Sequence, residues 1–353
     1  MKIGEIDVGS DHPPFFIAEA GVNHNGNLDT AKKLIDIAAD AGADAIKFQT
    51  FSADRLVTPE ASKAEYQTET TGEGSQYDML KRYELNRESH EILLKYCMKN
   101  DIMFLSTPFD SESVDMLVDL GVPAIKLGSG ELNNYPLIEY VAKTDLPMIV
   151  STGMGTMNEV KAAYSRIKRV NPSAEVVFLH CTASYPCDLD DVNLRAMQTM
   201  AEELTVPVGY SDHTLLPETP ALAVTAGATI VEKHFTMDRS LPGPDHEASL
   251  EPDELTRAVD LIETAAKVLG SAEKCPTDTE QESMDKSRKG LYAAVDISSD
   301  SKIRAEDIDV LRPATGLSPS QYDVVVGAYA TTDIATGEPI TAADVDSVEE
   351  VED

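Results

Sequence analysis

The sequence predicts an α/β protein, a (β/α)8 TIM barrel over roughly residues 1–270 followed by a smaller β-rich domain. Apolar runs of four to eight residues recur along the first part of the chain, and a stretch with helical periodicity follows each of them. Eight strands of this kind are enough to close a barrel of parallel strands. A doubly wound open sheet is the alternative, but no GxGxxG turn follows the first apolar run.

The repeating units define the expected elements in order. The predicted strands are Phe15–Val22, Ala45–Thr50, Ile102–Pro108, Ala124–Ser129, Met148–Thr152, Val176–Cys181, Val206–Ser211 and Thr229–Phe235. The predicted helices are Leu28–Ala41, Arg87–Lys99, Ser111–Leu120, Met157–Val170, Leu194–Glu203, Glu218–Ala226 and Pro252–Leu269. The connection Ser52–Asn86 is longer than the others and punctuated by glycine, which predicts a lid or binding loop on the carboxyl-terminal face of the barrel.

The composition changes after Gly270. Residues 271–287 are polar and predict a linker, and residues 288–353 form a small domain with an acidic tail. Within that domain, "DISSDSKIRAEDI" (Asp296–Ile308) matches "DIATGEPITAADV" (Asp333–Val345) without a gap, and Ile303 aligns with Ile340. Two copies are too few for a solenoid, so the repeat predicts a pseudo-symmetric β-rich fold.

The charge balance restricts the classes of function. The chain has 62 acidic and 29 basic residues, a net charge of −33, which excludes nucleic-acid binding because that needs a basic surface. A dense acidic shell is typical of proteins that stay soluble at high salt, so we expect a halophilic source. No apolar run reaches the roughly 18–20 residues of a membrane span, and the N-terminal segment lacks the apolar core of a secretory signal. We therefore expect a cytoplasmic protein without a membrane partner, whose four cysteines are reduced.

Polar side chains gather where the predicted strands end. In a barrel of this type the carboxyl-terminal ends of the strands carry the active site. Alternation puts Lys47 with Gln49, and Glu232 with His234, on one face of their strands. The other candidates at strand ends are Glu19, Thr107, Lys126, Ser129, Glu131, Ser151, Tyr185 and His213.

His213 and His234 lie at equivalent ends of consecutive strands, which are about 5 Å apart if paired in order. Two imidazoles at that separation can share one metal at about 2.1 Å each, leaving positions open for substrate oxygens. The alternative is a pair of hydrogen-bonded structural histidines.

Lys47 and Lys126 form a second constellation. A buried ammonium needs a partner, which predicts a bound anion such as phosphate near the glycine-rich turns 128–131 and 151–155. A Lys–Glu pair inside the barrel, for instance with Glu19, is one alternative, and Schiff-base chemistry is another. The loop after the last strand, rigidified by Pro–Gly–Pro, presents Arg239 and Asp245 to the same face.

The ordered motifs resemble those of a known family. The run "IAEAGVNHNG … IKFQT … STPFD … IKLGSGE … STGM … LHCTASYP … GYSDHT … EKHFTMDRSLPGPDHEASL" resembles the sialic acid synthases, the nonulosonate branch of the phosphoenolpyruvate-condensing enzymes. The resemblance covers nearly the whole chain. The C-terminal repeat, with "RPATGLSP" at 312–319, is similar to the antifreeze-like (SAF) domain of that family.

The resemblance implies a metal-dependent condensation of phosphoenolpyruvate with an N-acetylated aminohexose, giving a nine-carbon 2-keto sugar acid and phosphate. It implies a divalent ion on His213 and His234, manganese first, with magnesium or cobalt as alternatives. It also implies a domain-swapped homodimer, in which Arg312 of the SAF domain reaches the partner's site. The implied catalytic residues are Glu19, Lys47, Lys126, Glu131 and Glu232, and the implied substrate-binding residues are Gln49, Thr107, Ser129, Ser151, Tyr185, Asp245 and Arg312.

One departure concerns the acceptor sugar. The family motif carries asparagine where this chain has Ala183, so that contact is missing or comes from Ser184. The resemblance therefore leaves N-acetylmannosamine and 2,4-diacetamido-2,4,6-trideoxymannose open, and "LPGPDHEASLEPDEL" is at least as similar to the legionaminate-making branch. The rival hypotheses are another phosphoenolpyruvate-using or Schiff-base barrel aldolase, and a non-catalytic sugar-binding protein.

Overall fold

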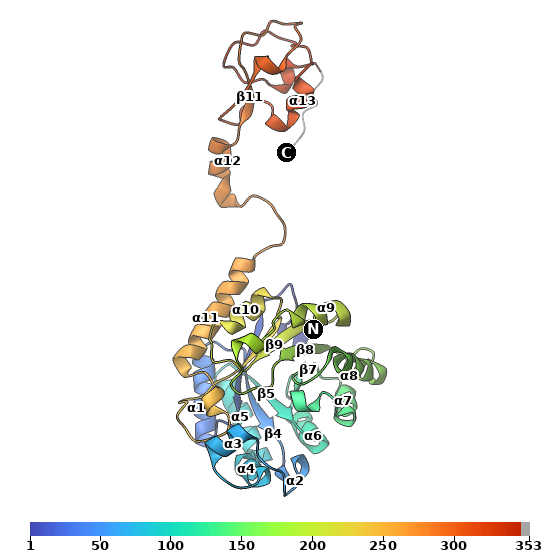
Figure 1. The fold of residues 1–353 in the computed structure, drawn as a ribbon, viewed down its shortest axis with the longest axis vertical. Helices are drawn as coiled ribbons and strands as arrows, with labels where there is room; N and C mark the ends of the chain where they lie inside the picture. The colour runs from blue at the N-terminus through green and yellow to red at the C-terminus, as the bar shows by residue number, and fades with distance from the viewer. Residues whose placement is uncertain (347–353) are drawn as a thin grey trace. The chain divides into compact units, whose positions relative to one another are not determined.

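The computed structural model describes residues 1–346, and its first compact unit, Met1–Gly270, is a barrel of parallel strands (Figure 1). The strands are β3 (Phe15–Gly21), β4 (Ala45–Thr50), β5 (Met103–Pro108), β6 (Ile125–Leu127), β7 (Met148–Ser151), β8 (Val176–Cys181), β9 (Val208–Asp212) and β10 (Ile230–His234). They hydrogen-bond in the order β5-β4-β3-β10-β9-β8-β7-β6, and β5 and β6 lie side by side to close the ring. The predicted fold class is confirmed.

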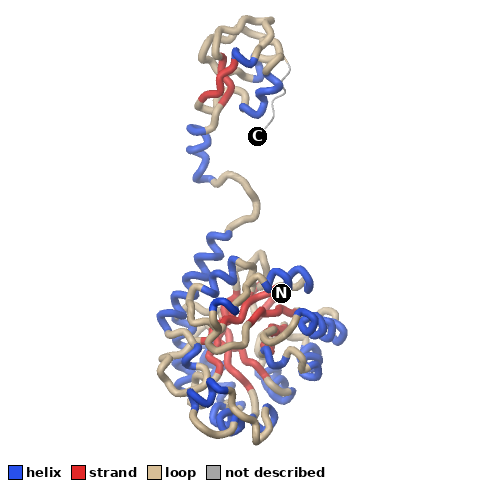
Figure 2. The backbone as a smooth tube through the Cα atoms, viewed as in Figure 1, coloured by secondary structure: helices blue, strands red, loops and turns tan. Residues whose placement is uncertain are grey.

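Helices surround the strands, as Figure 2 shows in blue around red. They are α1 (Leu28–Asp40), α5 (Arg87–Lys99), α6 (Ser111–Leu120), α7 (Tyr135–Val141), α8 (Met157–Val170), α9 (Ala196–Leu204), α10 (Thr219–Thr225) and α11 (Pro252–Leu269). Side-chain caps explain several starts: Asp110 accepts from the Ser113 amide at 2.9 Å, and Thr156 forms a capping box with Glu159. The helix α7 is not among the predicted helices; it is short and contains a proline in its first turn.

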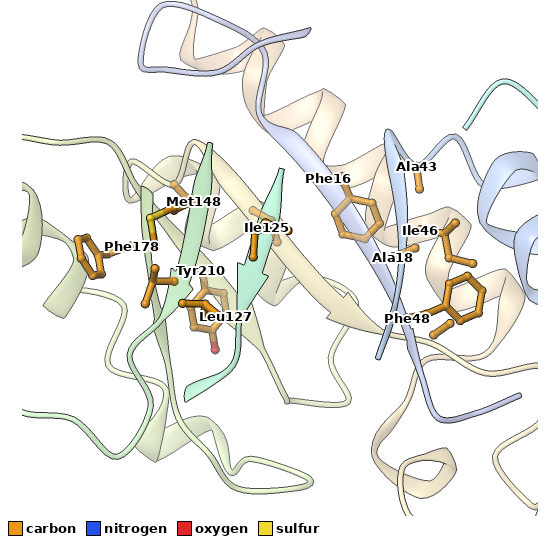
Figure 3. Packing of buried hydrophobic residues seen from close by; sticks show 14 of the residues in the cluster. Phe16, Ala18, Ala43, Ile46, Phe48, Ile125, Leu127, Met148, Phe178 and Tyr210 are labelled. Carbon is orange, nitrogen blue, oxygen red and sulfur yellow. The ribbon is translucent and has the colours of Figure 1, made fainter. Parts of the chain in front are cut away.

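Two apolar layers hold the barrel together. An outer layer lies between the strands and the helices, and Figure 3 shows part of it around Phe16, Phe48 and Phe178. An inner cluster fills the amino-terminal end of the barrel, where Ile17 and Leu105 pack with Ile3. Ile3 belongs to a small hairpin of β1 (Lys2–Ile3) and β2 (Ile6–Asp7), which the sequence analysis did not predict. With one end filled by apolar groups, only the carboxyl-terminal end is left for polar side chains.

The long connection after β4 folds into short helices. They are α2 (Ala53–Leu56), α3 (Glu65–Thr71) and α4 (Gln76–Tyr83). Met79 and Tyr83 of α4 pack against Val22 and Phe51, which follow β3 and β4. The segment therefore covers the carboxyl-terminal side of this part of the barrel, and it lines a cavity of about 610 Å³ together with α5 and α6.

The second compact unit starts at Ser271. Its elements are α12 (Gln281–Ser287), β11 (Gly290–Ala293), β12 (Ile308–Leu311) and α13 (Tyr322–Val325), and β11 pairs antiparallel with β12. The repeat is visible in the structure, because Ile297 and Ile334, at equivalent positions of the two copies, exchange both backbone hydrogen bonds at 2.8 Å. Ile303 and Ile340 are both fully buried.

Two expectations fall at the limits of the structure. The acidic tail lies, from residue 347 onward, outside the described residues. Within residues 1–346, the structure has no helix long and apolar enough to cross a membrane.

Candidate active site

The strand ladder brings the predicted polar residues to one end of the barrel. Glu19 on β3 is in register with Lys47 on β4 and with His234 on β10. Glu232 on β10 is in register with Ser211 on β9. Since side chains alternate along a strand, these groups point into the interior of the barrel, on the carboxyl-terminal side of the inner apolar cluster.

Two lysines and two glutamates form a buried charged cluster. Lys47 Nζ lies 2.8 Å from Glu19 Oε2 and 3.8 Å from Glu232 Oε2. Lys126 Nζ lies 3.5 Å from Glu232 Oε1, which also accepts a hydrogen bond from Ser211 Oγ at 3.1 Å. The Lys–Glu pair that the sequence left open is therefore present, and Glu232 joins both ammonium groups.

Burial and charge divide the roles within this cluster. Burial raises the pKa of Glu19 to about 7, although Lys47 counteracts it. Burial acts on Glu232 in the same sense, but Lys126 and Lys47 outweigh it and hold the pKa of that carboxyl below its ordinary value. Burial lowers the pKa of Lys126, with partial compensation from Glu232. Near neutral pH, Glu232 is thus the fixed anion and Glu19 the carboxyl that can gain or lose a proton.

His213 and His234 lie together beside this cluster, with ring centroids 5.5 Å apart. His213 Nδ1 is 2.7 Å from the Thr182 carbonyl oxygen and donates a hydrogen bond to it. In the neutral ring, Nε2 then keeps its lone pair. His234 Nδ1 is buried and has no hydrogen-bond partner among the described residues. Burial, together with the nearby His213 and Lys47, holds the pKa of His234 well below its ordinary value, so the ring is neutral.

This donor set fits a divalent transition metal. Two imidazoles within joint reach of one ion are suitable ligands for manganese, cobalt or zinc. Within residues 1–346, no group of three or more His, Cys, Asp or Glu side chains is arranged to hold a metal. With His213 and His234 as its protein ligands, an ion here would keep several coordination positions for substrate oxygens or water.

Asp245 and Tyr185 complete the surroundings of the histidines. The Tyr185 ring centroid lies 4.2 Å from that of His213 and 6.0 Å from that of His234. A Cβ added to Gly21 would lie 3.0 Å from Asp245 Oδ2 and 3.5 Å from His234 Cε1. The backbone of Gly21 therefore lies close to both side chains. Burial raises the pKa of Asp245 to about 6.

The hydroxyl groups orient the lysines and the backbone. Lys47 Nζ donates to Thr107 Oγ1 at 2.9 Å, and Lys126 Nζ donates to Ser151 Oγ at 2.7 Å. Ser129 Oγ accepts from the Gly153 amide at 3.0 Å. These contacts place Thr107 and Ser151 beside the lysines, whereas Ser129 contacts the backbone after β7.

Three predicted residues have other surroundings. Gln49 is half-buried on the strand face that it shares with Lys47. The Glu131 carboxylate accepts from Asn134 Nδ2 at 2.6 Å, at the start of α7. Arg312 follows β12 in the second unit. Their functional roles stay predictions.

Three further buried groups lie near the histidines and are not among the predicted site residues. Cys181 Sγ lies 3.8 Å from His213 Nδ1 and 3.4 Å from Ser129 Oγ. Lys233 and Asp212 form a buried ion pair at 2.6 Å on the outer side of the same strands. The signal for that pair was present, because each residue lies next to a predicted histidine in a strand that should otherwise be apolar on its outer face.

The fold and the pocket define a barrel enzyme with paired imidazoles, ammonium groups and carboxylates at its mouth, followed by a separate small domain. The NeuB family model matches residues 34–274, and the SAF domain model matches residues 288–346. The chain belongs to the NeuB family.

Individual relatives agree with this assignment. The chain is 48% identical over 324 residues to the N,N'-diacetyllegionaminic acid synthase of Legionella pneumophila, covering 91% of each chain. It is 42% identical to the synthase of the same name from Campylobacter jejuni, covering 88% of this chain and 94% of the relative. The crystal structure of N-acetylneuraminic acid (sialic acid) synthetase from Leptospira borgpetersenii, in complex with citrate, superimposes with a TM-score of 0.72 at 38% identity, covering 80% of this chain and 94% of that one.

Proposed function

We propose that this protein is a nonulosonate synthase, which condenses phosphoenolpyruvate with an N-acetylated aminohexose and releases phosphate. The preferred acceptor is 2,4-diacetamido-2,4,6-trideoxymannose, which makes the product N,N'-diacetyllegionaminic acid. The support for this acceptor is the graded similarity: 48% and 42% identity to two N,N'-diacetyllegionaminic acid synthases, against 37% to the human N-acetylneuraminate-9-phosphate synthase.

The observation that carries the proposal is the position of Glu232, which joins Lys47 and Lys126 within 3.8 Å and 3.5 Å at the end of the strand that carries His234. The proposed anion-binding pair and the proposed metal-binding pair would therefore lie at the same end of the barrel. When Glu19 is protonated, Lys47, Lys126 and the ionised Glu232 together have a net charge of +1. This charge suits the binding of a phosphate ester that also carries a carboxylate.

A divalent ion, manganese by preference, would be held by His213 and His234. When bound it supplies Lewis acidity to the carbonyl of the acceptor sugar. Tyr185 and Asp245 surround the histidines and would contact the sugar, and Gln49 would contact it from β4.

Lys47 and Lys126 would bind the phosphate and carboxylate of phosphoenolpyruvate. Ser151 and Thr107 hold the two ammonium groups in place. Ser129, which contacts the Gly153 amide, would also bind phosphoenolpyruvate. Since these donors are preorganised in a buried site, they stabilise the anion without reorganising during the reaction.

Glu19 is the group that would transfer a proton. As carbon–carbon bond formation leaves positive charge on the phosphate-bearing carbon, water adds there and loses a proton, and the resulting tetrahedral carbon expels phosphate. Glu19, protonated when phosphoenolpyruvate binds, would first give its proton to the alkoxide oxygen that carbon–carbon bond formation leaves on the acceptor. The resulting carboxylate, with a pKa of about 7 and held 2.8 Å from Lys47, would then accept the proton from water. Glu232 stays ionised and stabilises the positive charge, and Glu131, in the turn after β6, is retained as a catalytic candidate.

The decisive experiment is a phosphate-release assay with manganese and each candidate acceptor. Release is expected only with phosphoenolpyruvate, acceptor and metal together, and fastest with the diacetamido sugar. His213→Ala and His234→Ala should abolish release while leaving the circular dichroism spectrum unchanged. Full activity after thorough chelation would refute the metal-dependent reaction, and borohydride trapping of substrate on Lys47 or Lys126 would favour an aldolase.

We also propose that the active form is a homodimer in which Arg312 acts in the partner subunit's site. Subunit mixing tests this arrangement. Arg312→Ala and Lys47→Met chains should each be inactive alone. Refolding equal amounts together should restore about a quarter of the activity, because about half of the dimers are mixed and each mixed dimer has one intact site of two. No recovery on mixing, with dimers formed, would show that Arg312 does not act across subunits.

A further inference from the structure

Lys233 lies between Glu232 and His234 on β10 but points to the other side of the strand. Glu232 reaches Lys47 and Lys126 inside the barrel, whereas Lys233 shares the outward side with Val231 and Phe235, which belong to the apolar layer between strands and helices. Its side chain is 1% exposed. An ammonium group in this layer is unfavourable unless it is paired and hydrogen-bonded.

The partners of Lys233 come from the segment that carries His213. Lys233 Nζ lies 2.6 Å from Asp212 Oδ2 and donates to the Thr214 carbonyl oxygen at 2.5 Å and to Thr214 Oγ1 at 3.1 Å. Asp212 Oδ1 in turn accepts from the Thr214 amide at 2.9 Å. Both residues that flank His213 are therefore bound to one side chain of β10.

The same contacts relate the two histidines to each other. Lys233 is adjacent in sequence to His234, and its ammonium group holds Asp212 and Thr214 on either side of His213. The imidazole of His213 is fixed on the opposite side by the Thr182 carbonyl oxygen at 2.7 Å. The separation of 5.5 Å between the imidazole centroids thus depends on backbone positions that the outer ion pair ties together.

Stability alone does not account for this pair. Replacing a buried ion pair by well-packed apolar residues is often neutral or stabilising, so an apolar layer would not need Lys233 and Asp212. What an apolar pair could not supply is directional hydrogen bonding to the backbone beyond His213. Groups outside a metal site commonly orient the ligands in this way.

We propose that Lys233 and Asp212 are positioning residues, which set the distance and orientation of His213 relative to His234 for a shared metal ion. The proposal rests on the metal site of the proposed function. It concerns residues that touch neither substrate nor metal.

The test uses the paired replacement Lys233→Met/Asp212→Leu, which removes both charges at similar volume and leaves no unpaired ion in the layer. Manganese affinity of the metal-free protein is measured by electron paramagnetic resonance, without substrate. We expect the affinity to fall about 10- to 100-fold. Phosphoenolpyruvate affinity measured by calorimetry without metal should be unchanged, because Lys47 and Lys126 lie on the inner side.

Val231→Ala is the matched control, since it removes apolar contacts from the same outward side of the same strand. It should lower the thermal midpoint of unfolding and keep the manganese affinity of the wild type. A folded Lys233→Met/Asp212→Leu protein with wild-type manganese affinity would overturn the positioning role alone. Wild-type protein that binds no manganese would overturn the metal site and the positioning role together.

Discussion

The coupling between Lys126 and Glu232 can be measured through stability. Glu232→Gln removes the carboxylate that lies 3.5 Å from Lys126 Nζ, and both side chains are at most 5% exposed. At that distance, with an effective dielectric constant of about 20, the attraction is about 5 kcal/mol. Part of it offsets desolvation, so we expect Glu232→Gln to lower the free energy of unfolding by about 3–5 kcal/mol.

A double-mutant cycle isolates the pair. Lys126→Met, Glu232→Gln and the combined variant are unfolded in urea at about pH 8, and the coupling energy should be about 2–3 kcal/mol. Lys81 and Glu84 provide the control, because their charged atoms are closer, at 3.1 Å, but their side chains are 45% and 24% exposed. Their coupling should be much weaker than that of the buried pair, because solvent screens exposed charges. Equal coupling in the two pairs would refute the reasoning that burial makes the inner cluster strong.

Three other predictions follow from the pocket and the surface. Above pH 7 the Glu19 carboxyl ionises, and the affinity for phosphoenolpyruvate should fall by up to about tenfold per pH unit. Calorimetry should show a weaker pH dependence for Glu19→Gln. Identical pH profiles for the two proteins would show that Glu19 does not affect phosphoenolpyruvate binding. Gly21→Ala adds a methyl group 3.0 Å from Asp245 Oδ2, at a residue whose φ is +51°. It should lower the free energy of unfolding in urea by about 1–3 kcal/mol and reduce phosphate release. Wild-type stability of this variant would contradict the close approach. With a net charge of −33, the thermal midpoint should rise between about 0.1 M and 2 M KCl, and a flat response would argue against adaptation to salt.

The barrel and the site differ in how far sequence could predict them. The helical periodicity of apolar residues predicted the bounds of α5, α6, α8 and α11 to the residue, because strong periodicity and side-chain caps act locally. The short helix α7 and the hairpin of β1 and β2 have too few residues for a periodic signal. Strand ends were less certain: the strand predicted at Val206–Ser211 is Val208–Asp212.

The residues of the pocket were predicted better than their partners. Strand alternation placed Glu232 and His234 on one face, and the structure agrees. Whether Lys47 would bind Glu19 or only a substrate anion could not be predicted, because it depends on which strands become neighbours in the ring. The partner of Lys233 depends on strand pairing in the same way, since its ion pair with Asp212 crosses between two strands. The local pattern showed only that a charged side chain lies beside His234 in a buried strand.

Manganese binding by the histidine pair tests the central claim most directly. When manganese is added to the metal-free protein, electron paramagnetic resonance should show one tightly bound ion per chain in the wild type. It should show none in His213→Ala/His234→Ala. That double variant should still bind phosphoenolpyruvate, because Lys47 and Lys126 are intact. Tight binding of one manganese ion by the double variant would contradict a shared cation and anion pocket at the mouth of the barrel.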